Sequence, residues 1–183
     1  MSLRLTIVQL YCPVFLKKQK LAELFNRTAQ AFQMDPPDLS RKSLDEYLMQ
    51  FALFTQSAAE KILQSTNLSH EEVKKNLYRH TFQLGQKIRK QLGIRNFEEV
   101  LNASRFLYNL LGIDFKGDQN GEIIINKCYF SQFYSSQVCE LISGLDEGML
   151  AGLSGGGRLT FSQRITEGND CCKATLTYDG KNT

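Results

Sequence analysis

The sequence predicts an α+β protein in which an N-terminal helical layer packs on a small antiparallel sheet. Three observations lead to this fold class. Apolar residues recur at helical spacing through the first 112 residues, a β-branched run follows, and two late segments alternate apolar and polar side chains. With 183 residues and 42% hydrophobic content, the chain is expected to form one domain, 1–183, with a helical part (1–112) and a strand-helix-hairpin part (113–183).

Four helices are predicted in the helical part from apolar periodicity and capping signals. The first covers 15–34 and ends before a Pro-Pro pair, which cannot continue a helix. Ser43-x-x-Glu46 and Ser69-x-x-Glu72 have the spacing of capping boxes, in which serine and glutamate side chains accept hydrogen bonds from each other's backbone amides. These motifs open helices that run to about 63 and 92, and Asn96 opens a fourth that ends near 111.

The strand-helix-hairpin part differs from the helical part in its pattern of apolar and polar residues. A turn cluster rich in glycine and polar residues precedes a β-branched run, and a long apolar-striped segment separates this run from two alternating segments. The pattern predicts a long helix between the first strand and a C-terminal hairpin. The expected elements are a turn at 116–121, a strand at 122–127, a helix at 129–153, strands at 158–165 and 172–178, and a hairpin turn at 166–170.

The net charge of +3 is divided unevenly along the chain. Residues 1–113 carry 16 basic and 10 acidic side chains, whereas 114–183 carry 6 and 9. A cluster of basic residues on the third helix is typical of a solvent-exposed helical face, but Arg79 or His80 could instead bind an anionic ligand. No base-reading motif accompanies the basic residues, so we expect no specific nucleic-acid binding. The basic cluster on the third helix comprises Lys74, Lys75, Arg79, His80, Lys87, Arg89 and Lys90.

The location and partners follow from what the sequence lacks. No run of about 18 apolar residues predicts a membrane span, and no cleavage site follows the N-terminal apolar stretch, so a cytoplasmic protein is expected. Five cysteines without regular spacing indicate reduced thiols. A small molecule is the expected partner, a homodimer is left open, and no cofactor can be named.

The cysteines of the second part raise the question of chemistry. Cys128 falls at a predicted strand-helix junction, where free helical amides and the helix dipole would favour its thiolate, so early alkylation of Cys128 or Cys171 is expected. Strand alternation places Cys172 inward and Cys171 outward, while Cys139 is expected in the core. Small hydrophobic packing is the alternative for Cys128 and Cys172. No Cys-x-x-Cys spacing is present, so no metal site is predicted.

A hydrolase would need a nucleophile, an acid or base, and a partner for a substrate anion. Cys128 is the candidate nucleophile, Asp146 or Glu147 the acid or base, and Arg164 or Arg79 the anion partner. Asp146 and Glu147 could equally be solvent-facing residues of an amphipathic helix.

A non-catalytic ligand-binding module is the second hypothesis. The chain has 12 Phe and 7 Tyr, many at inward helical positions, among them Phe130 and Tyr134. Such stripes are typical of a core, but they can also line an apolar cavity for a tetrapyrrole, a lipid or a hydrocarbon. A haem would lack a strong axial ligand, because His70 lies in a polar cap region and His80 alone lies within a helix.

The C-terminal third also resembles a known family. Cys128-Tyr129-Phe130, the segment 145–153, and the segment 159–172 with its closing Gly168-x-x-x-Cys172 resemble the L-2-amino-thiazoline-4-carboxylic acid hydrolase family. The same residues are similar, more distantly, to the 4-vinyl-reductase domain, whose relatives include haem-based nitric-oxide sensors and vesicle-tethering subunits. Tyr129 stands where the hydrolase family typically has a proline.

The resemblance implies a pocket between the helical layer and the sheet, with cysteine-bearing ends converging on it. It implies binding of a small molecule and hydrolytic opening of a cyclic thiazoline carboxylate, with an apolar or tetrapyrrole-like ligand as the sensor alternative. The resulting candidate residues are Cys128, Asp146, Glu147 and Cys172 for catalysis and Arg79, His80, Phe130, Tyr134 and Arg164 for ligand binding.

Overall fold

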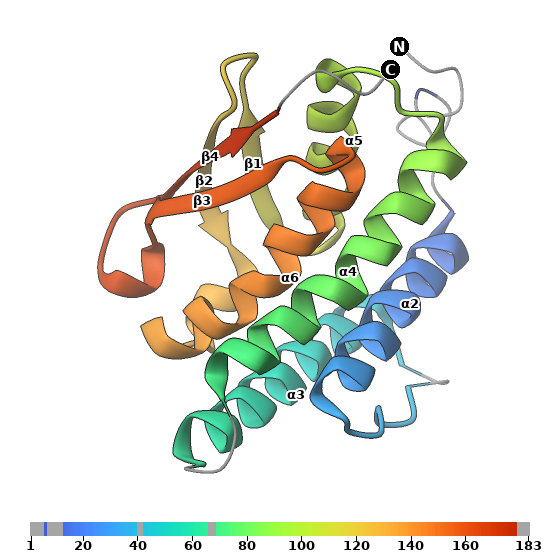
Figure 1. The fold of residues 1–183 in the computed structure, drawn as a ribbon. Coiled ribbons are helices and arrows are strands. Elements are labelled where there is room, and N and C mark those ends of the chain that lie inside the picture. Colours follow the sequence, from blue (N-terminus) through green and yellow to red (C-terminus); the bar gives the residue numbers. More distant parts are fainter. Residues whose placement is uncertain (1–5, 7–12, 40–41, 66–68, 179–183) are drawn as a thin grey trace.

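The computed structural model describes residues 6, 13–39, 42–65 and 69–178. Helices and strands follow in the predicted order, so the α+β class is confirmed (Figure 1). The elements are α2 (Val14–Phe32), α3 (Leu44–Gln64), α4 (His70–Leu92), α5 (Phe97–Leu110), β1 (Ile113–Gly117), β2 (Glu122–Cys128), the 3-10 helix η1 (Tyr129–Gln132), α6 (Ser136–Ser154), β3 (Arg158–Gln163), the 3-10 helix η2 (Ile165–Glu167) and β4 (Cys172–Thr177).

The four strands form one antiparallel sheet in the order β1-β2-β4-β3. Side chains alternate between buried and exposed along each strand, so one face of the sheet packs against helices and the other is exposed. Ile123 lies opposite Ala174, and Leu159 lies opposite Leu176, all on the buried face. The predicted hairpin of β3 and β4 is therefore confirmed.

Two local predictions are wrong. The sequence analysis gave no strand before 122, yet Ile113–Gly117 forms β1 and pairs with β2. The long helix begins at Ser136 instead of 129, because the Ser135 side chain accepts a hydrogen bond from the amide of Val138 at 3.2 Å and caps it there. The residues expected to be its first turns form η1 and an irregular link.

The helix starts in the first part follow the capping signals to different degrees. Ser43 and Glu46 form the predicted capping box, with the Ser43 amide donating to Glu46 at 2.7 Å. Asn96 caps α5 by accepting from the amide of Glu99. Ser69 precedes α4 but its side chain makes no capping hydrogen bond, so the second predicted capping box is wrong.

Helices α4 and α6 pack backbone against backbone. Gly144, Gly148 and Gly152 fall four residues apart on α6, and a Cβ atom at any of the three would collide with backbone atoms of α4. Gly85 on α4 lies equally close to the backbone of α6, since a Cβ atom at this position would lie 2.5 Å from the Met149 carbonyl oxygen. Figure 1 shows the two helices side by side beneath the sheet. This contact fixes α6 between the sheet and the outer helices.

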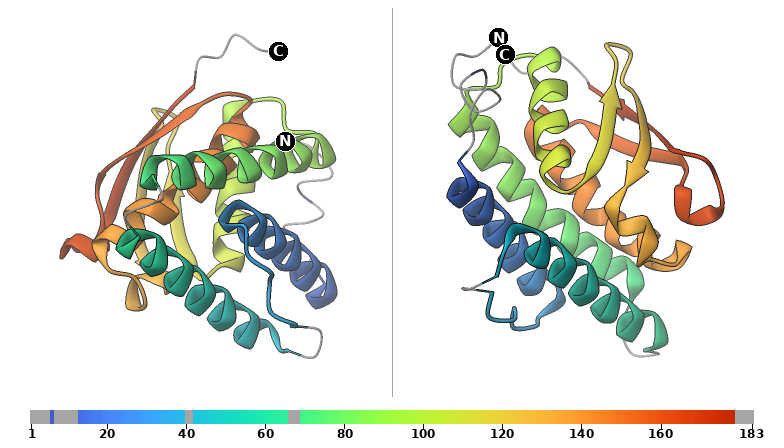
Figure 2. Two further views of the ribbon diagram at one scale, coloured as in Figure 1. Left: turned by 60° about the horizontal axis from the view of Figure 1, so that its bottom comes forward. Right: turned by 180° about the vertical axis from the view of Figure 1, so that it is seen from behind.

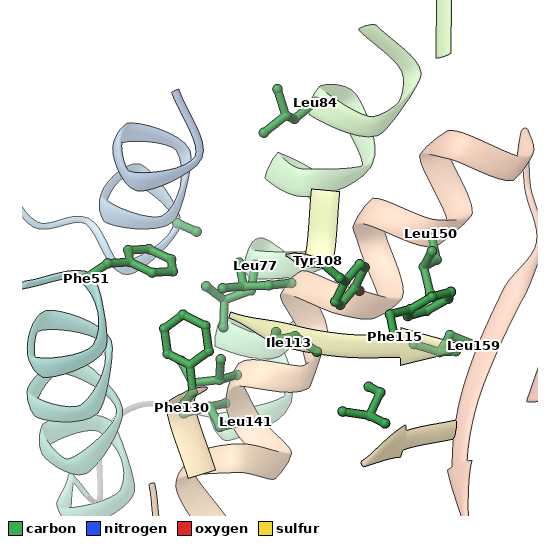
Figure 3. Packing of buried hydrophobic residues seen from close by; sticks show 14 of the residues in the cluster. Phe51, Leu77, Leu84, Tyr108, Ile113, Phe115, Phe130, Leu141, Leu150 and Leu159 are labelled. Carbon is green, nitrogen blue, oxygen red and sulfur yellow. The ribbon is translucent and has the colours of Figure 1, made fainter. Parts of the chain in front are cut away.

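Helices α2 and α3 complete the outer layer, which Figure 2 shows from two further directions. Phe25 of α2 is almost fully buried and meets Phe51 of α3 at 5.1 Å between ring centroids. Phe51 in turn meets Phe130 of η1 edge to face at 5.9 Å. Figure 3 shows these rings facing each other across the helical layer, with Tyr108 and Ile113 nearer the sheet. Aromatic contacts therefore link the outer helices to the end of β2.

None of the described helices combines the length and the hydrophobicity that a membrane span requires.

Candidate functional site

A cavity of about 130 Å³ lies between the helical layer and the end of the sheet where β2 finishes. It is lined from α2, α3, α4, α5, the start of β1, the end of β2, η1, α6, η2 and the start of β4, so residues distant in the sequence converge there. The cavity lies where the resemblance to the hydrolase family implied a pocket, between the helical layer and the sheet. The lining is predominantly aliphatic and aromatic: Leu21, Leu24, Phe51, Leu84, Ile88, Leu107, Leu110, Leu111, Ile113, Phe130, Ile142, Leu145, Met149 and Ile165.

The polar groups of the lining gather around one carboxyl, that of Asp146 on α6. The hydroxyl of the buried Tyr108 on α5 donates a hydrogen bond to Asp146 Oδ1 at 2.8 Å. Burial raises the pKa of Asp146 from 3.8 to about 6, although the hydrogen bond from Tyr108 opposes the rise. Burial and the nearby carboxylate also raise the pKa of Tyr108, so the phenol stays protonated and acts as the donor.

Tyr134 contributes a second phenol to the lining. Its hydroxyl is hydrogen-bonded to the Thr55 hydroxyl on α3, and burial raises its pKa well above the usual value. The ring of Tyr134 stacks on Phe130 with centroids 5.7 Å apart. Both predicted ligand-binding aromatics therefore reach the cavity and present apolar ring surface to it.

Three thiols also line the cavity, those of Cys128, Cys139 and Cys172. Burial raises the pKa of Cys128 to about 12 and that of Cys139 to about 11, and it raises the pKa of Cys172 as well. The expected easy ionisation of Cys128 is wrong, because Cys128 is followed by a four-residue 3-10 helix whose amides only partly offset the burial. At neutral pH these thiols are protonated.

The paired cysteines before β4 divide as strand alternation predicts. Cys172 is buried and Cys171 is half-buried, with its carbonyl oxygen accepting a hydrogen bond from the Gln163 side chain at 3.0 Å. The fifth cysteine, Cys12, lies outside the described residues.

Alkylation at neutral pH should therefore label Cys171 before Cys128, Cys139 and Cys172. The rate of alkylation follows the thiolate fraction and the exposure of each thiol, and burial in the cavity lowers both for the other three. Mass spectrometry after a short exposure to iodoacetamide measures the order. Faster labelling of Cys128 than of Cys171 would contradict the protonated state assigned to the cavity thiols.

Four predicted site residues do not line the cavity. Glu147 points away from it and forms an ion pair with Lys74 at 3.0 Å. Arg79 is exposed on α4 and donates to the Asn76 side chain. His80 is half-buried next to two arginines, and burial lowers its pKa. The structure therefore does not bring Glu147, Arg79 or His80 together with the cysteines.

Arg164, the fourth of these residues, lies beside the cavity without lining it. Its guanidinium is 3.3 Å from Glu167 and stands over the Phe161 ring at 4.9 Å. The next two residues, Ile165 and Thr166, do line the cavity. The buried Thr166 hydroxyl lies beside the Cys139 thiol and opposes the rise in the pKa of that thiol, but it makes no hydrogen bond of normal geometry within the described part of the chain.

Sequence reasoning missed three features of this site. Tyr108 was not among the candidate site residues, Cys139 was expected in the core, and Thr166 was assigned to a hairpin turn. The available signal was the inward helical position of Asp146, since an acid on the apolar side of a helix requires a hydrogen-bond donor from a neighbouring element.

An open groove of about 810 Å³ lies next to the cavity, on the side of β1 and the start of η1. Ile113, Cys128, Ser131 and Ile165 line both spaces, so the wall between them is one residue thick. In the described ranges, no group of three or more His, Cys, Asp or Glu side chains is placed to hold a metal ion.

The fold and the cavity define an α+β protein with an apolar internal site that carries one carboxyl. No family model matches the chain, and no curated protein matches it. Among solved structures, a vinyl-4-reductase family protein from Methanocaldococcus jannaschii is similar, with 15% sequence identity, a TM-score of 0.41, and coverage of 91% of this chain and 95% of that chain. The name of that structure is that of the family which the sequence resembles more distantly.

Proposed function

We propose that this protein is a binding module that takes up a small, predominantly apolar molecule in the cavity and does not hydrolyse it. The observation that carries the proposal is the nearly continuous aliphatic and aromatic lining of an internal space that side chains do not fill. Protein interiors are otherwise close-packed, and an empty space of this size costs stability unless a ligand occupies it.

The volume limits the ligand. An engineered apolar cavity of about 150 Å³ binds benzene, so about 130 Å³ suits one aromatic ring or a short alkyl chain. A tetrapyrrole has four rings, and drug-sized ligands occupy pockets of about 300 Å³ or more. The tetrapyrrole alternative is therefore not part of the proposal.

The chemistry of the lining favours binding over hydrolysis. Protonated thiols are weak nucleophiles, and neither histidine of the chain lines the cavity to deprotonate one. A thiazoline carboxylate would also place its negative charge near Asp146. Of the residues expected to receive that charge, Arg79 and His80 of α4 do not line the cavity, and Arg164 is paired with Glu167. Opening of a cyclic thiazoline carboxylate therefore has no support from these side chains.

Toluene is a suitable first probe, because it fits the cavity and offers no polar group. A ligand at ten times its Kd stabilises the folded state by about 1.4 kcal/mol, which raises the melting temperature measurably. We expect toluene to raise the melting temperature of the wild-type protein.

The control variants replace one cysteine inside the cavity and one outside it. Cys139→Phe places a ring in the cavity and should abolish the toluene effect, whereas Cys171→Phe introduces the same side chain away from the lining and should keep it. Circular dichroism verifies that both variants are folded, and Cys139→Leu serves if the larger ring prevents folding. Failure of toluene to stabilise the wild-type protein up to its solubility would contradict the proposal.

A further inference from the structure

Only one of the two carboxyl oxygens of Asp146 accepts a hydrogen bond from the described residues. Oδ1 accepts the hydrogen bond from Tyr108, but Oδ2 accepts none from any described residue. Asp146 lines the cavity and sits more than two helical turns inside α6, away from either end. Asp146 lines the cavity and keeps part of its surface accessible, so its second oxygen can accept a hydrogen bond from a donor that the cavity's occupant supplies.

The neighbouring polar groups are also able to accept hydrogen bonds. The buried Thr166 hydroxyl lines the cavity beside the Cys139 thiol, which is the group it can donate to, and its oxygen accepts no hydrogen bond from the described residues, so lone pairs remain available. Tyr108 gives its proton to Asp146 and retains lone pairs. The polar end of the cavity is thus rich in acceptors and matches a ligand group with several N–H donors.

No protein cation neutralises Asp146 at close range. Arg164 is directed to Glu167 and to the Phe161 ring and does not line the cavity. Lys20, the basic residue among the described lining residues, is half-exposed, lies 3.5 Å from Glu23 and donates to Gln91 at 3.1 Å. Arg164 lowers the pKa of Asp146 through its charge, but among the described residues no basic side chain forms an ion pair with this carboxyl.

Building on the proposed function, we infer that the ligand is a small apolar primary amine whose ammonium group pairs with Asp146 Oδ2 while its ring or chain fills the apolar part of the cavity. An ammonium has three N–H donors, which match the Asp146 carboxylate and the Thr166 hydroxyl. The carboxylate is already desolvated in the folded protein, so the ligand's own desolvation is the cost that the new ion pair must offset.

The pH dependence follows from the groups around Asp146. Tyr108 of α5, Glu147 of α6, Arg164 before η2 and the thiols of Cys128, Cys139 and Cys172 act on its charge or respond to it. The raised pKa values of the phenol and the thiols keep these groups neutral between pH 5 and 7, while Arg164 keeps its charge. With a pKa of about 6, Asp146 loses most of its charge over this range, and amine affinity should fall about tenfold from pH 7 to pH 5.

Four probes of nearly equal size test the inference: toluene, benzylamine, benzyl alcohol and benzoate. Calorimetry at pH 7 should show benzylamine binding at least tenfold more tightly than toluene, and benzoate more weakly than toluene. Asp146→Asn should lower the ratio of benzylamine to toluene affinity at least tenfold. Glu147→Gln removes the adjacent carboxylate, which is paired with Lys74 outside the cavity, and should leave the ratio unchanged.

The outcomes separate the two proposals. If toluene does not bind, the proposed function fails. If toluene binds but benzylamine binds no more tightly, or if benzyl alcohol matches benzylamine, the proposed function stands and the inferred ion pair is overturned. Should Asp146→Asn not fold, the wild-type titration decides, because benzylamine affinity that does not fall between pH 7 and pH 5 would also overturn the inference.

Discussion

Replacing Gly148 with alanine should destabilise the protein by roughly 1–3 kcal/mol. An added Cβ would overlap the carbonyl oxygen of Tyr78 and the hydroxyl of Thr81. The Tyr78 atom belongs to the backbone of α4, so relief requires α4 and α6 to move apart. Alanine favours helix over glycine by about 1 kcal/mol, which offsets only part of this cost.

Urea denaturation measures the change in the free energy of unfolding. Gln137→Ala is the matched control, because Gln137 is exposed on the same helix and its replacement should change stability by less than about 0.5 kcal/mol. A Gly148→Ala protein as stable as the wild type would show that the two helices do not pack at the distance described here.

Replacing Asp146 with asparagine should have the opposite effect and stabilise the protein at pH 7 by up to roughly 3 kcal/mol. The folded protein raises the pKa of this carboxyl from 3.8 to about 6, and one pKa unit corresponds to about 1.4 kcal/mol. Below pH 3.8 the group is protonated in both states and costs nothing. As the pH rises through 6, ionisation penalises the folded state, and the penalty stays constant above that pH. Asparagine cannot ionise and still accepts from Tyr108.

Urea denaturation at pH 4 and pH 7 measures whether the replacement raises or lowers the free energy of unfolding. The difference between Asp146→Asn and wild type should nearly vanish at pH 4 and reach its full size at pH 7. Asp170→Asn, at an exposed position before β4, should show no comparable change with pH. A loss of stability at pH 7 in Asp146→Asn would mean that the carboxylate stabilises the fold, and the assigned burial penalty would be wrong.

The sequence predicted the helices and the C-terminal hairpin because local signals there agree with the tertiary packing. It missed β1 because Ile113–Gly117 is short and merges with the polar turn that follows. It misplaced the start of α6 because Phe130, Phe133 and Tyr134 continue the apolar periodicity of the helix, although Ser135 is the actual cap. Where tertiary contacts place apolar residues outside a helix, periodicity alone cannot show the boundary.

Five of the nine candidate site residues lie together in the structure, and their roles stay predictions. Cys128, Asp146, Cys172, Phe130 and Tyr134 do line one cavity. The state of Cys128 could not be read from its position along the chain, since its pKa depends on burial by elements far away in sequence. The cavity itself is a space left between side chains of ten elements, and no single segment carries a signal for such a space.

The central claim is that the apolar cavity holds a small ligand, and intermolecular nuclear Overhauser effects between toluene and the protein test it most directly. The lining residues Leu24, Ile142 and Leu145 carry methyl groups that should contact bound toluene. Ile124 projects from the exposed face of β2 and serves as the control for adventitious surface contact. We expect cross-peaks from toluene to the three lining residues and none to Ile124. Cross-peaks to Ile124 alone, or none to the lining residues at saturating toluene, would contradict it.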